Sequence, residues 1–355
     1  MKRFIPVFLI SPFLYLVMLG VEPVDLQREI KRDYSSINKM LRIQPPPGSV
    51  ELEIACSFPT EEQEEQDQYF WNPYGIASDP VGNIFVIEFS NMVFKYDSAG
   101  KFIKKFGRTG QGPGELSRPL QIRSLKDSIV IAEDGNRRLQ YFDFEGNFRK
   151  IVKLFRWYFS FDINEEGLIF GVPLIRQNNE SQLIEVLSAE GKLINSFGSL
   201  LDYKHDHDYL NRAFLFLNKK GEVLVVFMYF PIVRRYSQKG SLIAEHYIKT
   251  EMMEEKEKHN KKLYSYRPQE RVAYIQAVHC AKIHGDHLFI LDYVPPRIYI
   301  MEMNEAGQLE NTYWAKVVDK YLAFSLLPDK ENDRMKFYVL QKNPEARINI
   351  FLPKN

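Results

Sequence analysis

The chain has 355 residues, enough to bury a large core as one big domain or two ordinary ones. Its 47 Lys and Arg residues balance 46 Asp and Glu residues, and the net charge of +1 leaves no field that would attract nucleic acid. We therefore expect no nucleic-acid partner. Aromatic residues make up 14% of the chain, with 26 Phe and 20 Tyr, which favours half-buried β-strands over helices.

The N-terminus has the pattern of an export segment. Two cationic residues precede an apolar run over residues 4–21. The run is long for a secretory signal and borderline for a membrane span, and no A-x-A-like cleavage site follows it. Residues 1–21 are therefore predicted to be either a cleaved signal peptide or a retained membrane anchor. Both alternatives place the rest of the chain in the periplasm or at the cell surface, tethered in the second case.

Residues 22–49 are predicted to link this segment to a folded domain. Apolar residues recur at helical spacing between residues 25 and 43, so a helical stalk is expected there. The stretch QPPPGS (44–49) then ends any helix, because successive prolines lack backbone donors and hold the chain extended. The folded domain is expected to begin near Val50 and to extend to residue 355.

Turn signals of the form polar-x-x-Gly recur throughout this domain. They end at Gly100, Gly146, Gly191, Gly240 and Gly307. Each glycine lies between two β-rich runs and provides the positive φ angle that a hairpin turn needs. A second hairpin lies upstream in each unit. Four short strands per unit, at a period of roughly 45 residues, indicate β-propeller blades.

One step between turn signals is longer because it contains a charged insertion at about residues 249–271. Glu254–Lys258 and Glu257–Lys261 are spaced i,i+4, as on a helix face exposed to water. We expect a solvated helix at this position.

The repeat count predicts an all-β fold, a six-bladed β-propeller with four-stranded blades. The first strands are expected to begin near Tyr74, Leu120, Phe159, Ala213, Ala277 and Leu322. The last unit ends after three strands, and VELEIACSF (50–58) is available as its outer strand. Pairing of this N-terminal strand with the last blade would close the ring and remove two exposed edges.

The stretch FGRTGQGPGEL (106–116) is interpreted as a connector between two blades. Its glycines do not follow the G-x-G-x-x-G spacing, and no G-K-[ST] follows them. A strand-like run comes next, and not a helix whose N-terminus could hold phosphate.

The first two units resemble the NHL-type repeat of six-bladed propellers. The resemblance covers residues 70–150 and is carried by Pro73, Tyr74, Gly75, Ile76, Asp79, Gly82, Asn83, Phe106 and Gly107, and then by Asp134, Asn136, Arg137 and Arg138. It implies a propeller fold. It leaves the activity open, since the family ranges from partner-binding modules to metal-assisted lyases and lactonases.

Three histidines are the candidates for a metal site on the face where ligands of propellers usually bind. His205 and His207 form an H-x-H pair flanked by Asp206 and Asp208, and this pair could offer two ligands to zinc. Only His279 is placed to add a third. The alternative interpretation is a solvated polar loop.

Two further sets of residues are predicted near the same face. The residues after each second strand, Glu88, Asp134, Tyr229, Asp292 and Gln341, could form a partly acidic ring or cap adjacent turns. The charged residues on the predicted inner strands, Arg123, Asp162 and Arg212, could grip a carboxylate or phosphate. They could equally be a solvated or self-paired structural set.

The sequence favours a binding role over an enzymatic one, with no catalytic residue and no cofactor predicted. It contains no G-x-S-x-G or H-E-x-x-H motif, and Cys56 and Cys280 are expected to be unpaired.

We expect a protein or glycan partner at the loop face, where the aromatic stretches 69–74 and 227–231 offer anchors. The candidate residues are Tyr74, Glu88, Arg123, Asp134, Arg137, Asp162, Arg212, Tyr229, His279 and Asp292. The alternatives are a metal-assisted lyase or lactonase and a structural spacer of an envelope assembly.

Overall fold

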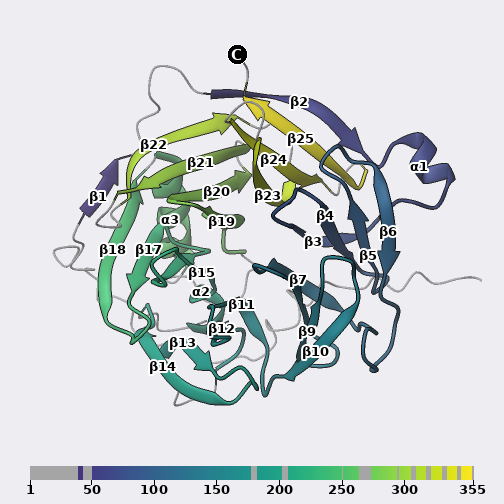
Figure 1. Ribbon diagram of the computed structural model, residues 1–355. Coiled ribbons are helices and arrows are strands. Elements are labelled where there is room, and N and C mark those ends of the chain that lie inside the picture. Colours follow the sequence, from purple (N-terminus) through teal and green to yellow (C-terminus); the bar gives the residue numbers. More distant parts are fainter. Residues whose placement is uncertain are drawn as a thin grey trace, which may run out of the picture.

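Six four-stranded antiparallel blades surround a central axis in the computed structural model (Figure 1). The structure describes residues 39–42, 50–176, 182–201, 207–249, 251–263, 273–293, 296–304, 309–316, 321–329, 334–341 and 345–353. Over these ranges, no helix has the length and apolar character needed to cross a membrane. The expected signal or anchor at 1–21 lies outside them.

Each of the first three blades is a four-stranded sheet formed by consecutive strands. Blade 1 contains β3 (Pro73–Ser78), β4 (Ile84–Glu88), β5 (Val93–Tyr96) and β6 (Phe102–Phe106). Blade 2 contains β7 (Pro119–Ser124), β8 (Ile129–Glu133), β9 (Arg138–Phe142) and β10 (Phe148–Lys153). Blade 3 contains β11 (Tyr158–Ile163), β12 (Ile169–Pro173), β13 (Gln182–Leu187) and β14 (Leu193–Ser199).

The last three blades complete the ring. Blade 4 contains β15 (Ala213–Leu217), β16 (Val223–Phe227), β17 (Ile232–Tyr236) and β18 (Leu242–Lys249). Blade 5 contains β19 (Cys280–His284), β20 (His287–Tyr293), β21 (Pro296–Met303) and β22 (Leu309–Lys316). Blade 6 contains β23 (Tyr321–Asp329), β24 (Arg334–Gln341), β25 (Arg347–Pro353) and, outermost, β2 (Val50–Phe58). Three helices, α1 (Glu61–Glu65), α2 (His207–Leu210) and α3 (Glu251–Leu263), lie in connectors.

The core lies between neighbouring blades. The second strands β4, β12 and β16 are buried at every residue, because each blade is covered on both faces by its neighbours. The buried apolar residues of the described chain form six clusters, and each cluster joins one blade to the next. Packing between blades therefore stabilises the ring all the way round.

The predicted closure of the ring is confirmed. Strand β2 pairs antiparallel with β25, from Leu52 opposite Pro353 to Phe58 opposite Ile348. Its first two residues also pair in parallel with β22, which joins blades 5 and 6 into one eight-stranded sheet. Strand β2 thus covers the outer edge of blade 6, which would otherwise offer unpaired backbone groups.

The expected helical stalk does not extend through residues 39–42. These residues form a short strand, β1 (Lys39–Arg42), which pairs in parallel with β18. The outer edge of blade 4 offers unpaired backbone donors and acceptors, and they hold this segment extended. Residues 22–38 and 43–49 lie outside the described residues.

The glycine-rich stretch 106–116 is a connector, as predicted. Arg138 donates to the carbonyl oxygens of Gln111, Gly112 and Glu115 over 2.5–3.0 Å. Gln140 donates to the same Glu115 carbonyl and accepts from the Gly114 amide. Two buried side chains of β9 therefore fix the backbone of the connector that leads into their own blade.

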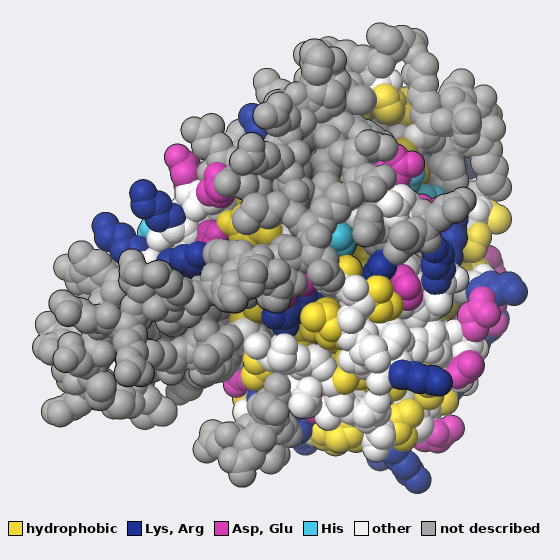
Figure 2. Space-filling view, turned by 90° about the vertical axis from the view of Figure 1, so that its left-hand side faces the viewer, with side chains coloured by type: hydrophobic (Ala, Val, Ile, Leu, Met, Phe, Trp, Pro, Cys, Tyr) yellow, Lys and Arg dark blue, Asp and Glu magenta, His cyan; other side chains and the backbone are white. Residues whose placement is uncertain are grey.

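The cysteines are free, as expected. Cys56 lies on β2 and Cys280 on β19, and neither is in a disulfide. Figure 2 views the ring from its left-hand side in Figure 1, and the coloured acidic and basic side chains are interspersed there. This distribution agrees with the near-zero net charge.

Candidate functional site

One end of the ring, here called the loop face, carries two kinds of segment. These are the connectors from the outer strand of one blade to the inner strand of the next, and the loops between second and third strands. Backbone bonds join the two kinds: the Leu154 amide donates to the Arg137 carbonyl, and the Met228 amide donates to the Arg212 carbonyl. Each of these bonds therefore ties a connector to a loop of the blade that it borders.

Helix α3 covers the loop face at blades 4 and 5. Figure 1 places it within the outline of the ring, between β17 and β20. The fully buried Asn260 donates to the carbonyl oxygens of Tyr229 and Ile275 at 2.9 and 2.8 Å and accepts from the Ile275 amide at 2.8 Å. Met253 is also fully buried and joins the core between these two blades. The insertion is a helix, as predicted, but it packs against the ring.

The expectation that this helix is solvated is wrong for its charged inner face. Lys256 pairs with Asp292, and both side chains are buried. Glu257 accepts from the Tyr247 hydroxyl and pairs with Lys261 at 3.0 Å. Buried charges are tolerated when they are paired, and here the partners belong to β18 and β20 of the propeller.

Three predicted site residues lie in this covered region. Asp292 and Tyr229 are fully buried, and His279 Nδ1 lies 3.7 Å from Asp292 Oδ1. Burial, reinforced by the Lys256 charge, lowers the pKa of His279 to about 3. The imidazole is therefore neutral at physiological pH. The structure assigns these residues to the packing beneath α3.

The predicted ring of polar residues is not an open acidic ring. Glu88 is buried, and one carboxylate oxygen accepts from the Trp71 and Asn72 amides at 3.1 Å while the other accepts from Ser90. Gln341 is also buried and accepts from Asn349. These side chains bind their own loops and strands.

The counterpart of Glu88 in blade 2 is Glu133, which the sequence analysis missed. Glu88 pairs opposite Pro73 and Glu133 opposite Pro119, at the same position of the two blades. Glu133 accepts from the Ser117 amide at 2.8 Å, as Glu88 does from its connector. Alignment of the two X-Pro strand starts would have identified it.

Asp134, the predicted member of the ring in blade 2, lies one residue further on. Its carboxylate pairs with Arg118 at the surface, and burial raises the pKa of this carboxyl. It joins two loops of the loop face and does not belong to an acidic ring.

Arg123 and Asp162 link inner strands around the central channel. Arg123 Nε donates to the Phe161 carbonyl at 3.1 Å, and its guanidinium lies over the rings of Phe161 and Phe216. Asp162 accepts from the Leu217 amide at 2.8 Å. The pair therefore connects blades 2, 3 and 4, which supports the structural alternative. Lys282 from blade 5 completes this group, and burial lowers its pKa to about 8.

Arg212 lies in a cluster of aromatic rings. Its guanidinium lies 4.5 Å from the ring centre of Tyr209 and 5.8 Å from that of Phe159. Tyr209 contacts Tyr229 at 4.7 Å and Tyr274 at 5.9 Å between ring centres. Cation–π contacts thus hold Arg212 at the border of the covered region.

The proposed histidine set is not assembled in the described chain. His205 lies outside the described residues, and the side chain of His207, the first residue of α2, does too. His279 is buried beneath α3. Among the described residues, no group of three or more His, Cys, Asp and Glu side chains is arranged to hold a metal ion.

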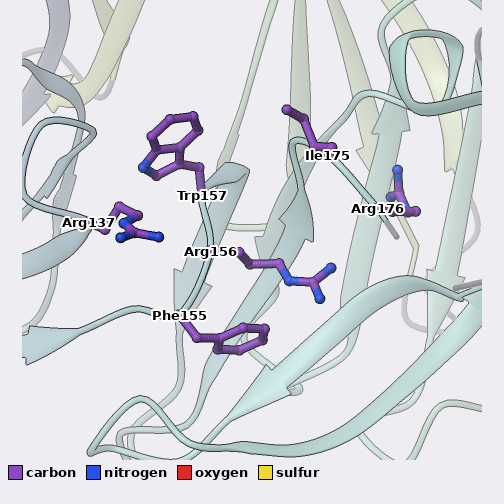
Figure 3. Close-up of a pocket in the computed structure, with 6 residues that line it drawn as sticks. All are labelled: Arg137, Phe155, Arg156, Trp157, Ile175 and Arg176. Carbon is purple, nitrogen blue, oxygen red and sulfur yellow. The ribbon is translucent and has the colours of Figure 1, made fainter. Parts of the chain in front are cut away.

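A pocket of about 250 Å³ opens on the loop face between blades 2 and 3 (Figure 3). Its lining comes from three segments that are distant in sequence: the loop after β8, the connector between β10 and β11, and the loop after β12. The lining residues are Arg137, Phe155, Arg156, Trp157, Ile175 and Arg176. We call this the blade 2–3 pocket.

The three arginines of the blade 2–3 pocket differ in their partners. Arg176 donates to the carbonyl oxygens of residues 182 and 183 at 3.1 and 3.2 Å and lies 3.4 Å from Asp208. Arg156 lies 3.3 Å from Glu185 and over the Phe155 ring. Arg137 is exposed, and within the described residues no hydrogen bond or ion pair of its guanidinium is found. It is the arginine with the greatest freedom to bind a ligand.

Comparison with known families agrees with this architecture. The model of the family DUF5128, described as 6-bladed beta-propeller, matches residues 77–347. The chain belongs to this family. No protein of the curated set matches the sequence significantly.

Solved structures similar to this DUF5128 propeller are found at low sequence identity. A protein of Bacteroides fragilis inferred to be exported is 10% identical, with a TM-score of 0.61, and the match covers 89% of this chain and 100% of that one. Virginiamycin B lyase from Staphylococcus aureus, bound to quinupristin, is 14% identical with a TM-score of 0.48, over 84% and 88% of the two chains. The Pan2 WD40 domain of Neurospora crassa is 8% identical with a TM-score of 0.48, over 87% and 97%.

Blade 1 of the DUF5128 propeller adds exposed aromatic residues to the loop face. Trp71 is 67% exposed, although its backbone amide is fixed by Glu88. Tyr74, a predicted site residue, and Phe89 are partly exposed, and their ring centres are 6.0 Å apart. The loop face of blades 1 to 3 therefore combines aromatic surface with a basic pocket, a composition suited to binding.

The sequence analysis identified Arg137 and Tyr74 on this open part but missed the connector residues FRW (155–157). Three bulky side chains in a connector that leads out of a strand were the available signal. These side chains line one pocket with Arg137 and Arg176 only because two blades pack together. No spacing of residues in the sequence predicts this arrangement.

Proposed function

We propose that the protein is an exported binding module that recognises a protein or glycan partner through the open loop face of blades 1 to 3. The observation that carries this proposal is the blade 2–3 pocket and its neighbouring exposed aromatics, on the part of the face that α3 leaves uncovered. Exposed aromatic and arginine side chains are the residues that contribute most to binding at interfaces.

Export and membrane tethering belong to the same proposal. The cationic start and apolar run over residues 4–21 support export. The description of the Bacteroides fragilis neighbour as exported is consistent with it. A retained anchor would hold the loop face near the membrane, and a cleaved signal would release a free module.

We also propose that blades 1 and 2 are NHL-type repeats. Residues of the expected pattern have structural roles that fit a repeat: Asp79 accepts from the Val81, Gly82 and Asn83 amides in the first turn. Asn136 donates to the Gly110 carbonyl.

The lyase or lactonase alternative required His279 to join His205 and His207 at one metal. His279 is buried against Asp292 beneath α3, so no observation favours this function. The spacer alternative predicts no saturable binding to any partner, and the following experiment distinguishes it from the proposal.

A photo-cross-linking amino acid is placed at Trp71 on the open loop face or, as a control, at Ile194 on an outer strand. Ile194 is also exposed, at 56%. In envelope fractions of the producing cell, position 71 is expected to give adducts that excess unlabelled protein suppresses, and position 194 is not. Equal adducts at both positions, or none at either, would contradict a binding role for this face.

A further inference from the structure

We propose that the blade 2–3 pocket binds a carboxylate carried on a six-membered ring, from either a sugar acid or an aromatic acid. In this proposal Arg137 contacts the carboxylate and Trp157 contacts the ring. The inference rests on the proposed function, because the pocket lies on the same open face.

The charge of the pocket matches a single negative group. Among the described residues, Arg156 is paired with Glu185 and Arg176 with Asp208. Arg137 has no such partner within the part of the chain that the structure describes. One guanidinium with two free parallel donors matches the geometry of one carboxylate, which it can bind in bidentate fashion.

The backbone holds Arg137 beside the aromatic wall. Its φ angle is +47°, in the left-handed region, and its carbonyl accepts from the Leu154 amide at 2.8 Å. This bond joins the loop after β8 to the connector that carries residues 155–157. The base of the Arg137 side chain is therefore fixed before any ligand binds, which reduces the entropy lost on binding.

The aromatic wall provides an apolar surface that a ring would cover. Phe155 is 45% and Trp157 37% exposed, and Figure 3 shows both flanking the pocket with the arginines between and beside them. The connector is fixed here too, because the Leu174 amide donates to the Trp157 carbonyl at 3.0 Å. Burial of exposed aromatic carbon by a flat or chair-shaped ring is favourable.

The volume limits the size of the bound group. At about 250 Å³, the pocket lies just below the ~300–1,000 Å³ of sites that enclose drug-sized ligands. It can hold one ring with its carboxylate, such as one residue of a longer molecule.

Titration calorimetry on the purified full chain at low salt tests the proposal. The probes are glucuronate and benzoate, each compared with its neutral counterpart, glucose or benzamide, and with inorganic phosphate. At least one carboxylate is expected to bind, with its neutral counterpart and phosphate binding at least about tenfold more weakly. The carboxylate that binds identifies the ring as a sugar or an aromatic one.

Two variants locate the binding, and a third is the control. Arg137→Gln and Trp157→Ala are each expected to weaken carboxylate binding about tenfold or more. Arg149→Gln removes the same charge at the opposite end of β10, where Arg149 pairs with the exposed Asp127, and is expected to change nothing. All three positions are at least partly exposed, so the variants should fold.

The proposal is overturned if neither carboxylate binds, if a neutral counterpart or phosphate binds equally well, or if Arg137→Gln binds like the wild type. Saturable cross-links at Trp71 in the absence of carboxylate binding would remove this inference and leave the proposed function standing. Carboxylate binding without cross-links would remove the macromolecular partner and retain a small-molecule site.

Discussion

The loop face has two parts, open over blades 1 to 3 and covered over blades 4 and 5, although the strand topology of these blades is the same. In the open part, buried charged side chains such as Glu88 and Arg138 hold the backbone of short connectors, and exposed aromatics and Arg137 remain at the surface. In the covered part, Lys256 and Asn260 of a long connector bind into the blades themselves.

This difference shows that connector length, and not blade structure, determines which part of the loop face stays accessible. A short connector leaves the ends of two blades accessible, and a helical one converts the same ends into core. The position of a polar residue at the end of a second strand is therefore no indication of a binding role by itself. Asp292 and Glu88 occupy this position and are both buried, for different reasons.

Deletion of residues 50–58 is expected to have the largest effect, because it removes the closure on which both parts depend. The outer edge of blade 6 would lose its partner strand and expose unpaired backbone groups, so the protein should unfold or aggregate. Differential scanning calorimetry and light scattering measure the outcome. A deletion variant with an unchanged melting temperature would show that β2 does not close the ring.

Lys256→Met should destabilise the covered part by about 3–5 kcal/mol, because it leaves the Asp292 carboxylate buried without its ion-pair partner. Denaturant unfolding gives the free-energy difference. The matched control is Lys258→Met on the exposed side of the same helix, expected to change stability by less than about 0.5 kcal/mol. Equal effects of the two substitutions would mean that α3 is not packed on the blades.

Glu88→Gln should destabilise the open part by a smaller amount, about 1–2 kcal/mol. The amide retains an acceptor for the Trp71 and Asn72 amides but loses the charge that strengthens these bonds. Hydrogen exchange at these two amides should accelerate. Glu166→Gln, in an exposed turn, is the control, and faster exchange there as well would point to a global effect.

The pH dependence of stability should carry a further signature of the covered part. His279 titrates near 6.5 when unfolded and near 3 when folded, so the unfolded state binds more protons between these values. The free energy of unfolding should therefore fall as the pH is lowered from 6.5, by at most about 1.4 kcal/mol per unit. In His279→Gln this slope should be shallower. An identical slope would place His279 in contact with water.

The sequence was sufficient for the fold because each blade repeats local signals. The glycine turns, the β-rich runs that flank them and the unpaired last unit are all readable from the sequence, and they predicted the blade number and the closure by β2. The packing of α3 was not readable. Its composition is that of a solvated helix. Lys256 is buried because it forms an ion pair with Asp292 of β20, which its position in the sequence does not reveal.

The candidate site shows the same limit. Arg137 and Tyr74 were found because they lie in repeat positions that a resemblance marks. Arg156 and Trp157 have no counterpart in other blades, and their relation to Arg137 arises where two sheets pack side by side. A feature that occurs only once in a repeat protein therefore cannot be recognised from the repeat pattern of its sequence.

The closure by β2 has a consequence for the order of events during synthesis. Ser57 on β2 donates to Asn349 on β25 at 2.6 Å across a separation of 292 residues. The strand that completes the last blade leaves the ribosome early and has no partner until nearly the whole chain has followed. Such long-range pairing is slow to form, and until it does the nascent protein exposes an aggregation-prone edge. Until then the ring stays open, because its last blade lacks the outer strand that closes it.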